Sequence, residues 1–174
     1  MSAASGSIVV RRATPADLPS IGRLGALLVR VHHDFDPRRF IAPTPRTEQG
    51  YASFLGSQLD KKDVTVLVAE WNGGVVGYVF ASVEGFDYMS LRGPAGVLQD
   101  IVVDPAHRGQ GIGGQLLAAA LEAREALGAP RVVLSTAERN APAQRLFARA
   151  GFRRTMIEMT RELGARVEET GEVH

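Results

Sequence analysis

The sequence predicts an α/β fold in which one mixed, mostly antiparallel sheet carries helices on both faces. Two valine-rich runs flank Asn72-Gly73-Gly74, a pattern typical of an antiparallel hairpin. A third apolar run, 97–103, leads through a proline turn and a glycine-rich loop into a long amphipathic helix, and a β-type run follows that helix. Such a strand–helix–strand connection is right-handed and makes its two strands parallel. Both kinds of pairing together indicate a mixed sheet.

The first third of the chain predicts one strand and two helices. Residues 8–12 have the composition of a strand. Thr14-Pro15-Ala16-Asp17 is a helix start, with threonine at the cap, proline at the first helical position and an acid three residues after the cap. Apolar residues follow at helical spacing: Leu18, Ile21, Leu24, Leu28 and Val31. We expect an irregular segment over 32–40 and a second helix over 47–59.

Glycines and prolines divide the rest of the chain. We expect strands over residues 64–71, 75–84, 97–103, 132–136 and 152–163, and helices over residues 111–127 and 140–150. Gly128 and Gly151 end these two helices, as glycine commonly does. The order of elements is therefore strand, two helices, three strands, helix, strand, helix and strand.

Length and composition favour a compact cytoplasmic protein. At 174 residues the chain is most simply a single domain, 1–174, with an ordered core over about 8–163 and a polar, frayed tail over 164–174. A formal charge of +1 provides no field for nucleic acid or an anionic membrane, and we expect neither as a partner. The chain has no cysteine, so any thiol must come with a cofactor. No apolar run approaches the roughly 18 residues of a membrane span, and the N-terminus lacks the features of a signal peptide.

The glycine-rich loop predicts an anion site. Backbone N–H groups at the start of a helix have no partner within the helix, and the helix dipole favours negative charge there. Gly109, Gly111, Gly113 and Gly114 let the backbone approach a bulky anion closely. Arg108 could add a charge-assisted contact. The ligand should therefore carry phosphate.

The same loop fits the fingerprint of a dinucleotide-binding domain only in part. Gly109-x-Gly111-x-x-Gly114 matches that fingerprint, which needs its glycines directly after the strand and an acid roughly 20 residues on. Here the residues from Asp104 to Arg108 separate strand from loop, and the segment 129–135 contains no acid. A nucleotide-binding or scaffolding domain stays an alternative function.

Two motifs resemble the GCN5-related N-acetyltransferase (GNAT) family. Arg108-x-x-Gly111-x-Gly113 is similar to its motif A, and the segment 140–152 is similar to its later pattern of Asn, Ala, an aromatic and Gly-Phe. The resemblance implies the acyl-CoA N-acyltransferase fold, in which two parallel strands splay apart around acetyl-CoA as co-substrate. It implies the following cofactor-binding residues: Ile101, Val102, Val103, Arg108, Gly109, Gln110, Gly111, Ile112, Gly113, Gly114, Asn140, Ala143 and Phe147.

The chain departs from this family where a catalytic acid and base are usual. Many members have Tyr where this chain has Phe147, and use its hydroxyl to protonate the departing thiolate; others have glutamates at the places of Gln99 and Ser135. Asp100 and Glu84 are the candidate catalytic carboxylates. Strict strand alternation puts Asp100 on the face opposite its neighbour, although a β-bulge could re-aim it.

The histidine pair His32-His33 could relay a proton near the acceptor, and without a third ligand at useful spacing we expect no metal site.

The sequence thus predicts an acetyl-CoA-dependent N-acetyltransferase. The acetyl group passes to a primary amine of a small molecule or peptide by direct attack, helped by a backbone N–H near Val103. A protein that senses acetyl-CoA without turnover is an alternative, because the usual acid and base are missing. The strand expected at 152–163 leaves a sheet edge with apolar residues, which predicts a homodimer through the C-terminal region.

Overall fold

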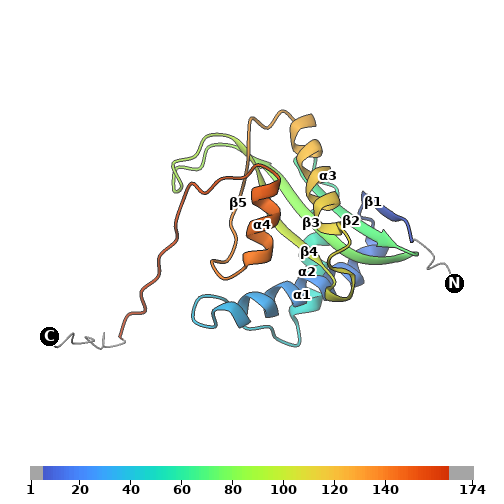
Figure 1. Cartoon of the computed structure of the whole chain (residues 1–174), viewed down its shortest axis with the longest axis horizontal. Coiled ribbons are helices and arrows are strands. Elements are labelled where there is room, and N and C mark those ends of the chain that lie inside the picture. Colours follow the sequence, from blue (N-terminus) through green and yellow to red (C-terminus); the bar gives the residue numbers. More distant parts are fainter. Residues whose placement is uncertain (1–5, 165–174) are drawn as a thin grey trace.

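The computed structural model describes residues 6–164 and confirms the mixed sheet with helices on both faces (Figure 1). The elements in chain order are β1 (Ile8–Arg12), α1 (Leu18–Phe35), α2 (Thr47–Gly56), β2 (Val64–Trp71), β3 (Gly74–Glu84), β4 (Ala95–Val103), α3 (Ile112–Ala126), β5 (Val132–Leu134) and α4 (Ala141–Arg149). The sheet order is β1-β2-β3-β4-β5. All neighbours are antiparallel except β4 and β5, which are parallel as predicted.

The hairpin between β2 and β3 has the predicted turn. Asn72 and Gly73 have φ values of 48° and 81°, the left-handed region that suits a two-residue hairpin loop. Asp17 also behaves as predicted: its carboxylate accepts a hydrogen bond from the Thr14 backbone N–H at 2.7 Å, at the start of the helical segment. Local sequence signals were sufficient for both features.

Several boundaries differ from those predicted. The irregular segment does not begin at His32, because α1 continues through the histidine pair to Phe35 and ends next to Asp36. The residue before a proline is disfavoured in the helical conformation, so Pro37 sets this end. Helix α2 ends at Gly56, three residues early, and β5 ends at Leu134, two residues early.

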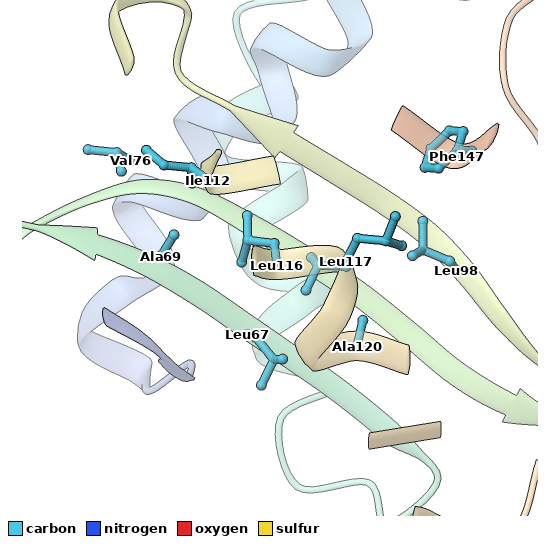
Figure 2. Packing of buried hydrophobic residues seen from close by; sticks show 10 residues of the cluster. Leu67, Ala69, Val76, Leu98, Ile112, Leu116, Leu117, Ala120 and Phe147 are labelled. Carbon is cyan, nitrogen blue, oxygen red and sulfur yellow. The ribbon is translucent and has the colours of Figure 1, made fainter. Parts of the chain in front are cut away.

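The sheet has a separate apolar core on each face. On one face, Ile112, Leu116 and Leu117 of α3 pack against buried residues of β2, β3 and β4, as Figure 2 shows. On the other face, α1 and α2 cover Val66, Tyr78 and other buried strand residues. Burial on both faces stabilises the sheet at roughly 25 cal/mol per Å² of apolar surface.

Close contact between α1 and α2 depends on glycine. A Cβ atom on Gly25 would lie 2.2 Å from Cδ1 of Tyr51, and one on Gly22 would lie 2.5 Å from the carbonyl oxygen of Glu48. Both glycines lie in the middle of α1, where they weaken the helix itself. Gly22 instead lets the backbone of α2 approach closely, and Gly25 lets the Tyr51 ring lie directly on the backbone of α1, which fixes the position of that ring.

The register of β4 against β3 contains a bulge at Gln99. Phe80 pairs with Asp100 and Ala81 pairs with Leu98, which leaves Gln99 as the extra residue. Leu98 and Ile101 pack in the core on the α3 face, whereas Gln99 and Asp100 both line a hollow whose other walls include residues of α2. The bulge therefore brings two successive polar side chains to the same side of the sheet.

Strands β4 and β5 are paired over only a short ladder and then separate. Their ladder joins Gly96 to Val132, Val97 to Val133 and Leu98 to Leu134, and there it ends. Strand β4 continues to Val103, while the chain after β5 leaves the sheet. The carboxyl ends of the two parallel strands are therefore separated, as the family resemblance implied.

The prediction of a final strand over 152–163 is wrong. This segment, which we call the C-terminal arm, is extended but pairs with no strand in the described part of the chain, and Figure 1 shows it leading away from the rest of the molecule beyond α4. Its large apolar side chains Met156, Ile157, Met159 and Leu163 are 70–92% exposed. Alternating apolar residues indicate an extended backbone, but they do not supply a neighbouring strand. Of the tail expected to fray, residues 165–174 lie outside the described residues.

Across residues 6–164, no helix has the length and apolar character needed to cross a membrane.

Candidate active site

A hollow of about 270 Å³ lies where β4 and β5 separate; we call it the central hollow. Helix α1, helix α4 and the ends of the two strands enclose it. Its lining is mostly apolar, with a few polar groups: Leu28, Val29, His32, Phe40, Ile41, Tyr51, Leu98, Gln99, Asp100, Ile101, Ser135, Thr136, Asn140, Ala143 and Phe147. A concave apolar site with a few convergent polar groups is the usual form of a small-molecule site.

Asp100 is the acid of this lining. It is partly buried, and the Tyr78 hydroxyl donates a hydrogen bond to its Oδ2 at 2.9 Å. Burial raises the pKa of the Asp100 carboxyl above its usual value, while the Tyr78 hydrogen bond and the nearby His32 oppose that rise. A carboxyl with a raised pKa in a cleft is suited to accepting a proton.

Two further polar side chains beside Asp100 are held by the helices. Tyr51 reaches the hollow from α2, and burial, helped by the negative Asp100, raises the pKa of its hydroxyl to about 12. Nδ1 of His32 lies 2.8 Å from the Leu28 carbonyl oxygen, so in the neutral ring it is the donor and Nε2 is the free acceptor. His33 does not line the hollow; its Nδ1 lies 3.0 Å from the Phe40 carbonyl oxygen.

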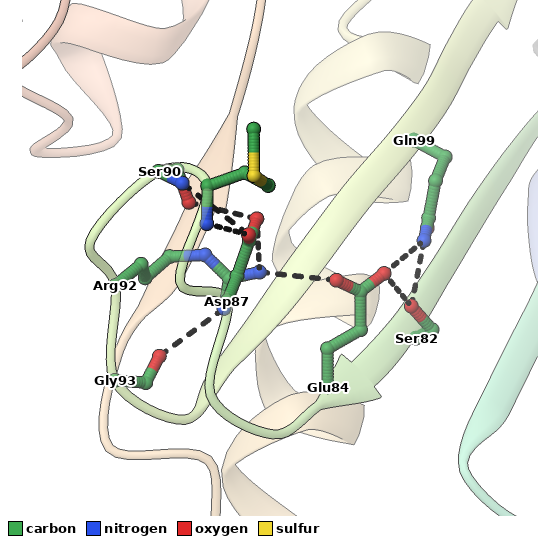
Figure 3. A network of polar contacts seen from close by, with 8 residues as sticks. Ser82, Glu84, Asp87, Ser90, Arg92, Gly93 and Gln99 are labelled. Carbon is green, nitrogen blue, oxygen red and sulfur yellow. Dashed lines mark hydrogen bonds and ion pairs between the residues drawn. The ribbon is translucent and has the colours of Figure 1, made fainter.

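Glu84, the other predicted carboxylate, lies in a separate polar network. Figure 3 shows its carboxylate between Arg92, which donates at 3.0 Å, and the side chains of Ser82 and Gln99. Arg92 also faces Asp87 across the same loop. Glu84 does not line the central hollow. Its charge is balanced within the network, and Gln99 links that network to Asp100 along the strand.

The loop before α3 has the form of an anion cradle. Gly109 and Gly111 have φ values of 76° and 78°, and a Cβ atom on either would meet nothing within 4 Å. The Gly111 carbonyl accepts the first helical hydrogen bond, from the Gln115 N–H at 3.1 Å. The first N–H groups of α3 are therefore free at its N-terminus. The Arg108 side chain folds back, its Nε donating to the Val103 carbonyl at 3.2 Å.

The start of α4 closes the other side of the hollow. Asn140 caps the helix, its Oδ1 accepting from the Ala143 N–H at 3.3 Å. Phe147 is 6% exposed and lies edge to face with Phe152 at a ring distance of 5.9 Å. The glycine cradle offers backbone N–H groups to a pyrophosphate, and this wall offers an apolar surface to a thioester arm. The residues present fit acetyl-CoA.

The predicted cofactor residues fall into three places. Ile101, Asn140, Ala143 and Phe147 line the central hollow. The run from Arg108 to Gly114 forms the cradle, although the Ile112 side chain is 1% exposed in the α3 core and offers only its backbone. The other two belong to the cores of the sheet: Val102 is 6% exposed and packs in the α1 and α2 core, and Val103 is partly buried against the α3 core.

Sequence reasoning missed the aromatic side of the site. Phe40, Ile41 and Tyr51 line the hollow, and none was a predicted site residue. For Tyr51 the one signal in the sequence is Gly25, a small residue in the middle of α1. A glycine there allows a ring from a neighbouring helix to pack on the helix backbone, and Tyr51 of α2 does so.

Comparison with known proteins places this chain in a family. The family model described as "Acetyltransferase (GNAT) family" matches residues 28–152. The aminoalkylphosphonate N-acetyltransferase of Salmonella typhimurium is 31% identical over 154 residues, which cover 88% of this chain and 90% of that protein.

Solved structures agree in fold. The BH1408 protein from Bacillus halodurans superposes with a TM-score of 0.75 at 21% identity, over 89% of this chain and 99% of that one. The aminoglycoside N-acetyltransferase AAC(6')-Iy, solved in complex with CoA, superposes with a TM-score of 0.69 at 18% identity, over 95% of this chain and 100% of that one. The family model and the Salmonella relative together show that this chain belongs to the GNAT acetyltransferase family and is an acyltransferase.

Proposed function

We propose that this acetyltransferase moves the acetyl group of acetyl-CoA directly to a primary amine in the central hollow, with Asp100 as the proton acceptor. One observation carries the proposal: the bulge at Gln99 brings the Asp100 carboxylate into the gap where β4 and β5 separate. The cradle before α3 holds the pyrophosphate, and the wall formed by Asn140, Ala143 and Phe147 holds the arm that ends in the thioester.

The reaction has a simple balance. An ammonium group enters beside Asp100 and gives its proton to the carboxylate, directly or through one water. The neutral nitrogen attacks the thioester carbonyl, the C–N bond forms, and the C–S bond breaks. As the amide forms, the second nitrogen proton passes to water, and water protonates the departing thiolate. The proton on Asp100 returns to solvent, so each turnover releases one amide, one CoA thiol and one proton.

Two features of the chain bear on these reaction steps. A backbone N–H at the bulge polarises the thioester carbonyl, because a bulged residue leaves the strand ladder and its N–H is free. We therefore assign this donor to residues 99–101 and not to the expected Val103, which does not line the hollow. Phe147 has no hydroxyl to give to the thiolate, so we assign that proton to water.

Asp100 is favoured over Glu84 by position and by charge. Asp100 lines the hollow and its only described hydrogen-bond partner is a neutral tyrosine. Glu84 is ion-paired with Arg92 and lies outside the hollow. A carboxylate already neutralised by a guanidinium is a weaker base.

Calorimetry and a thiol-release assay test the proposal together. We expect acetyl-CoA to bind, NAD and ATP not to bind, and CoA thiol to appear only when an amine is added. Binding without turnover over a broad amine panel would instead support an acetyl-CoA sensor. Binding of NAD or ATP in preference to acetyl-CoA would support the nucleotide-binding alternative. The relative named above acts on aminoalkylphosphonates by its name, so the panel includes one.

We also propose a homodimer formed through the C-terminal arm. Four large apolar side chains on the arm face solvent, and β5 has β4 as its only neighbour in the described sheet. An open edge and an exposed apolar strand-like segment favour pairing between copies. Light scattering at micromolar concentration should give twice the chain mass of 18.7 kDa, and a variant ending after Arg153 should give the single-chain mass. A single-chain mass for the full-length protein would overturn the dimer.

A further inference from the structure

A second hollow adjoins the central one and is lined by aromatic rings; we call it the aromatic hollow. It measures about 440 Å³ and is lined by Gly50, Tyr51, Phe54, Phe80, Gln99 and Asp100. Phe54 and Phe80 lie edge to face with a ring distance of 5.9 Å. The two hollows share Tyr51, Gln99 and Asp100, so the candidate base stands at their junction.

The aromatic hollow lies away from the residues that fit acetyl-CoA. None of the cradle residues and none of the α4 wall lines it. Its walls come from α2, β3 and the bulge of β4. A molecule that occupies it therefore reaches Asp100 without displacing the thioester arm, as a nucleophile must.

The linings of the two hollows contain few charged side chains. Among the residues of the described chain that line either hollow, Asp100 is the one acid and none is lysine or arginine. The nearby Arg39 lies over the Phe40 ring at 4.9 Å, and its guanidinium is paired with both carboxylate oxygens of Glu158. Among the same lining residues of the described chain His32 is the one basic side chain, and it lines the central hollow alone. An anionic group in the acceptor would thus enter the aromatic hollow without a cation to pair with, and a second ammonium would enter without a second carboxylate. Both arrangements are costly in a partly buried site.

We propose that the acceptor is a small primary amine with a single ammonium group and an apolar, preferably aromatic, body that carries no anionic group. The ammonium lies at Asp100, within reach of the Tyr51 ring, where an aromatic face attracts a cation. The body packs against Phe54 and Phe80, whose exposed and buried rings form the two walls of the hollow; Phe54 is 52% exposed and Phe80 is 6% exposed. This inference rests on the proposed function and adds to it the chemical class of the substrate.

A matched pair of amines tests the inference by binding and by turnover. 2-Phenylethylamine and 2-aminoethylphosphonate share the ethylamine unit and differ in the body; spermidine adds a polycation. We expect 2-phenylethylamine to bind the CoA-loaded protein in calorimetry, and its kcat/KM in thiol release to exceed that of the other two by at least about tenfold. Equal or tighter binding of the phosphonate or spermidine would overturn the inference, as would absence of 2-phenylethylamine binding.

These outcomes separate the inference from the proposed function. Thiol release with a phosphonate or polyamine in preference would leave the acetyltransferase proposal standing and overturn the acceptor class. Selective binding of 2-phenylethylamine without thiol release from any amine would overturn the proposed function and uphold the acceptor class.

An aromatic variant locates the effect. Phe54→Ala removes an exposed ring, so we expect it to fold, to keep acetyl-CoA affinity and to raise the KM for 2-phenylethylamine by about tenfold. Phe86→Ala is the control, because Phe86 is 70% exposed and lines neither hollow; its KM should match that of the wild type. A Phe54→Ala enzyme with an unchanged KM would contradict the placement of the body in the aromatic hollow.

Discussion

The Tyr78 hydroxyl donates a hydrogen bond to Oδ2 of Asp100 at 2.9 Å, between neighbouring strands of the sheet. Tyr78 is fully buried, and its pKa is raised, chiefly by that burial, so it stays a donor across the working range of pH. The hydrogen bond favours the ionised form of Asp100 and partly offsets the burial that favours the protonated form. One tyrosine thus tunes the carboxyl that we propose as base.

The pH dependence of the rate should report this carboxyl. The pKa of Asp100 is raised above its ordinary value of 3.8, so the active carboxylate forms at a higher pH than in an ordinary aspartate. We expect kcat/KM to rise with pH as this carboxyl ionises. Asp100→Asn should abolish this acid limb and lower kcat by about 10²- to 10⁴-fold, which is typical of a lost general base. Initial rates of thiol release, measured from pH 4 to 9, test both effects.

Two controls accompany that profile. Tyr78→Phe removes the hydrogen bond that lowers the pKa of Asp100, so the acid limb should move to higher pH. Asp87→Asn changes a partly exposed carboxylate outside both hollows and should keep the wild-type limb. An unchanged limb in Asp100→Asn would show that another group accepts the proton.

The glycine cradle predicts a specific loss of cofactor binding. Gly111→Val places a branched side chain where we propose that the pyrophosphate binds. It should reduce acetyl-CoA affinity in calorimetry by at least about 100-fold, because several charge-assisted hydrogen bonds are lost. Gly128→Val is a matched control, since Gly128 has the same φ of 78° and equally open space just beyond the other end of α3. Both variants carry similar backbone strain, so equal affinities would refute the cradle.

Phe147 allows a gain-of-function test. It lines the central hollow, so Phe147→Tyr would add a proton donor near the departing thiolate. We expect acetyl-CoA affinity to stay nearly unchanged and kcat to rise, because water is then no longer the acid. A fall in kcat with unchanged affinity would indicate that the hydroxyl disturbs the packing against Phe152 and that protonation is not limiting.

Acid should weaken the fold through Asp17. The hydrogen bonds from Arg11, at 2.8 and 2.9 Å, lower the pKa of the Asp17 carboxyl from 3.8 to about 2. The stabilisation is therefore complete above about pH 4 and is lost as the pH falls toward 2. Asp17→Asn should lower the free energy of unfolding by about 1–2 kcal/mol at pH 6, allowing for the partly exposed arginine, and by nearly nothing at pH 2.

Denaturant titrations from pH 2 to 6 check this trend. Asp60→Asn is the control, because Asp60 is exposed and has no ion pair among the described residues. A destabilisation in Asp17→Asn that does not vary with pH would contradict the role given to the Arg11 ion pair.

The parts of the fold that depend on short segments could be predicted from the sequence. Asn72-Gly73 specifies its hairpin by backbone preference, and the proline turn and glycines after β4 specify the cradle. The family motifs add the expectation that acetyl-CoA lies between β4 and β5. These signals act over a few residues, so a single sequence contains them.

The features that depend on pairing between distant segments could not be predicted. Strict alternation of β4 separates Gln99 from Asp100, and only the register against β3 shows that a bulge puts both on one side. Alternation in the C-terminal arm indicates a strand, but a strand needs a neighbour. Phe54 and Phe80 come from different elements, so their contact is visible only in the folded chain.

Transfer of a labelled acetyl group tests the central claim most directly. The protein is incubated with ¹³C-acetyl-CoA and 2-phenylethylamine, and mass spectrometry counts labelled amide, free CoA and any acetylated protein. We predict one labelled amide for each CoA released, no labelled protein in the absence of amine, and at least about a 100-fold slower appearance of amide with Asp100→Asn. Release of CoA without amide, or a labelled protein that passes its acetyl group on, would contradict direct transfer in the central hollow.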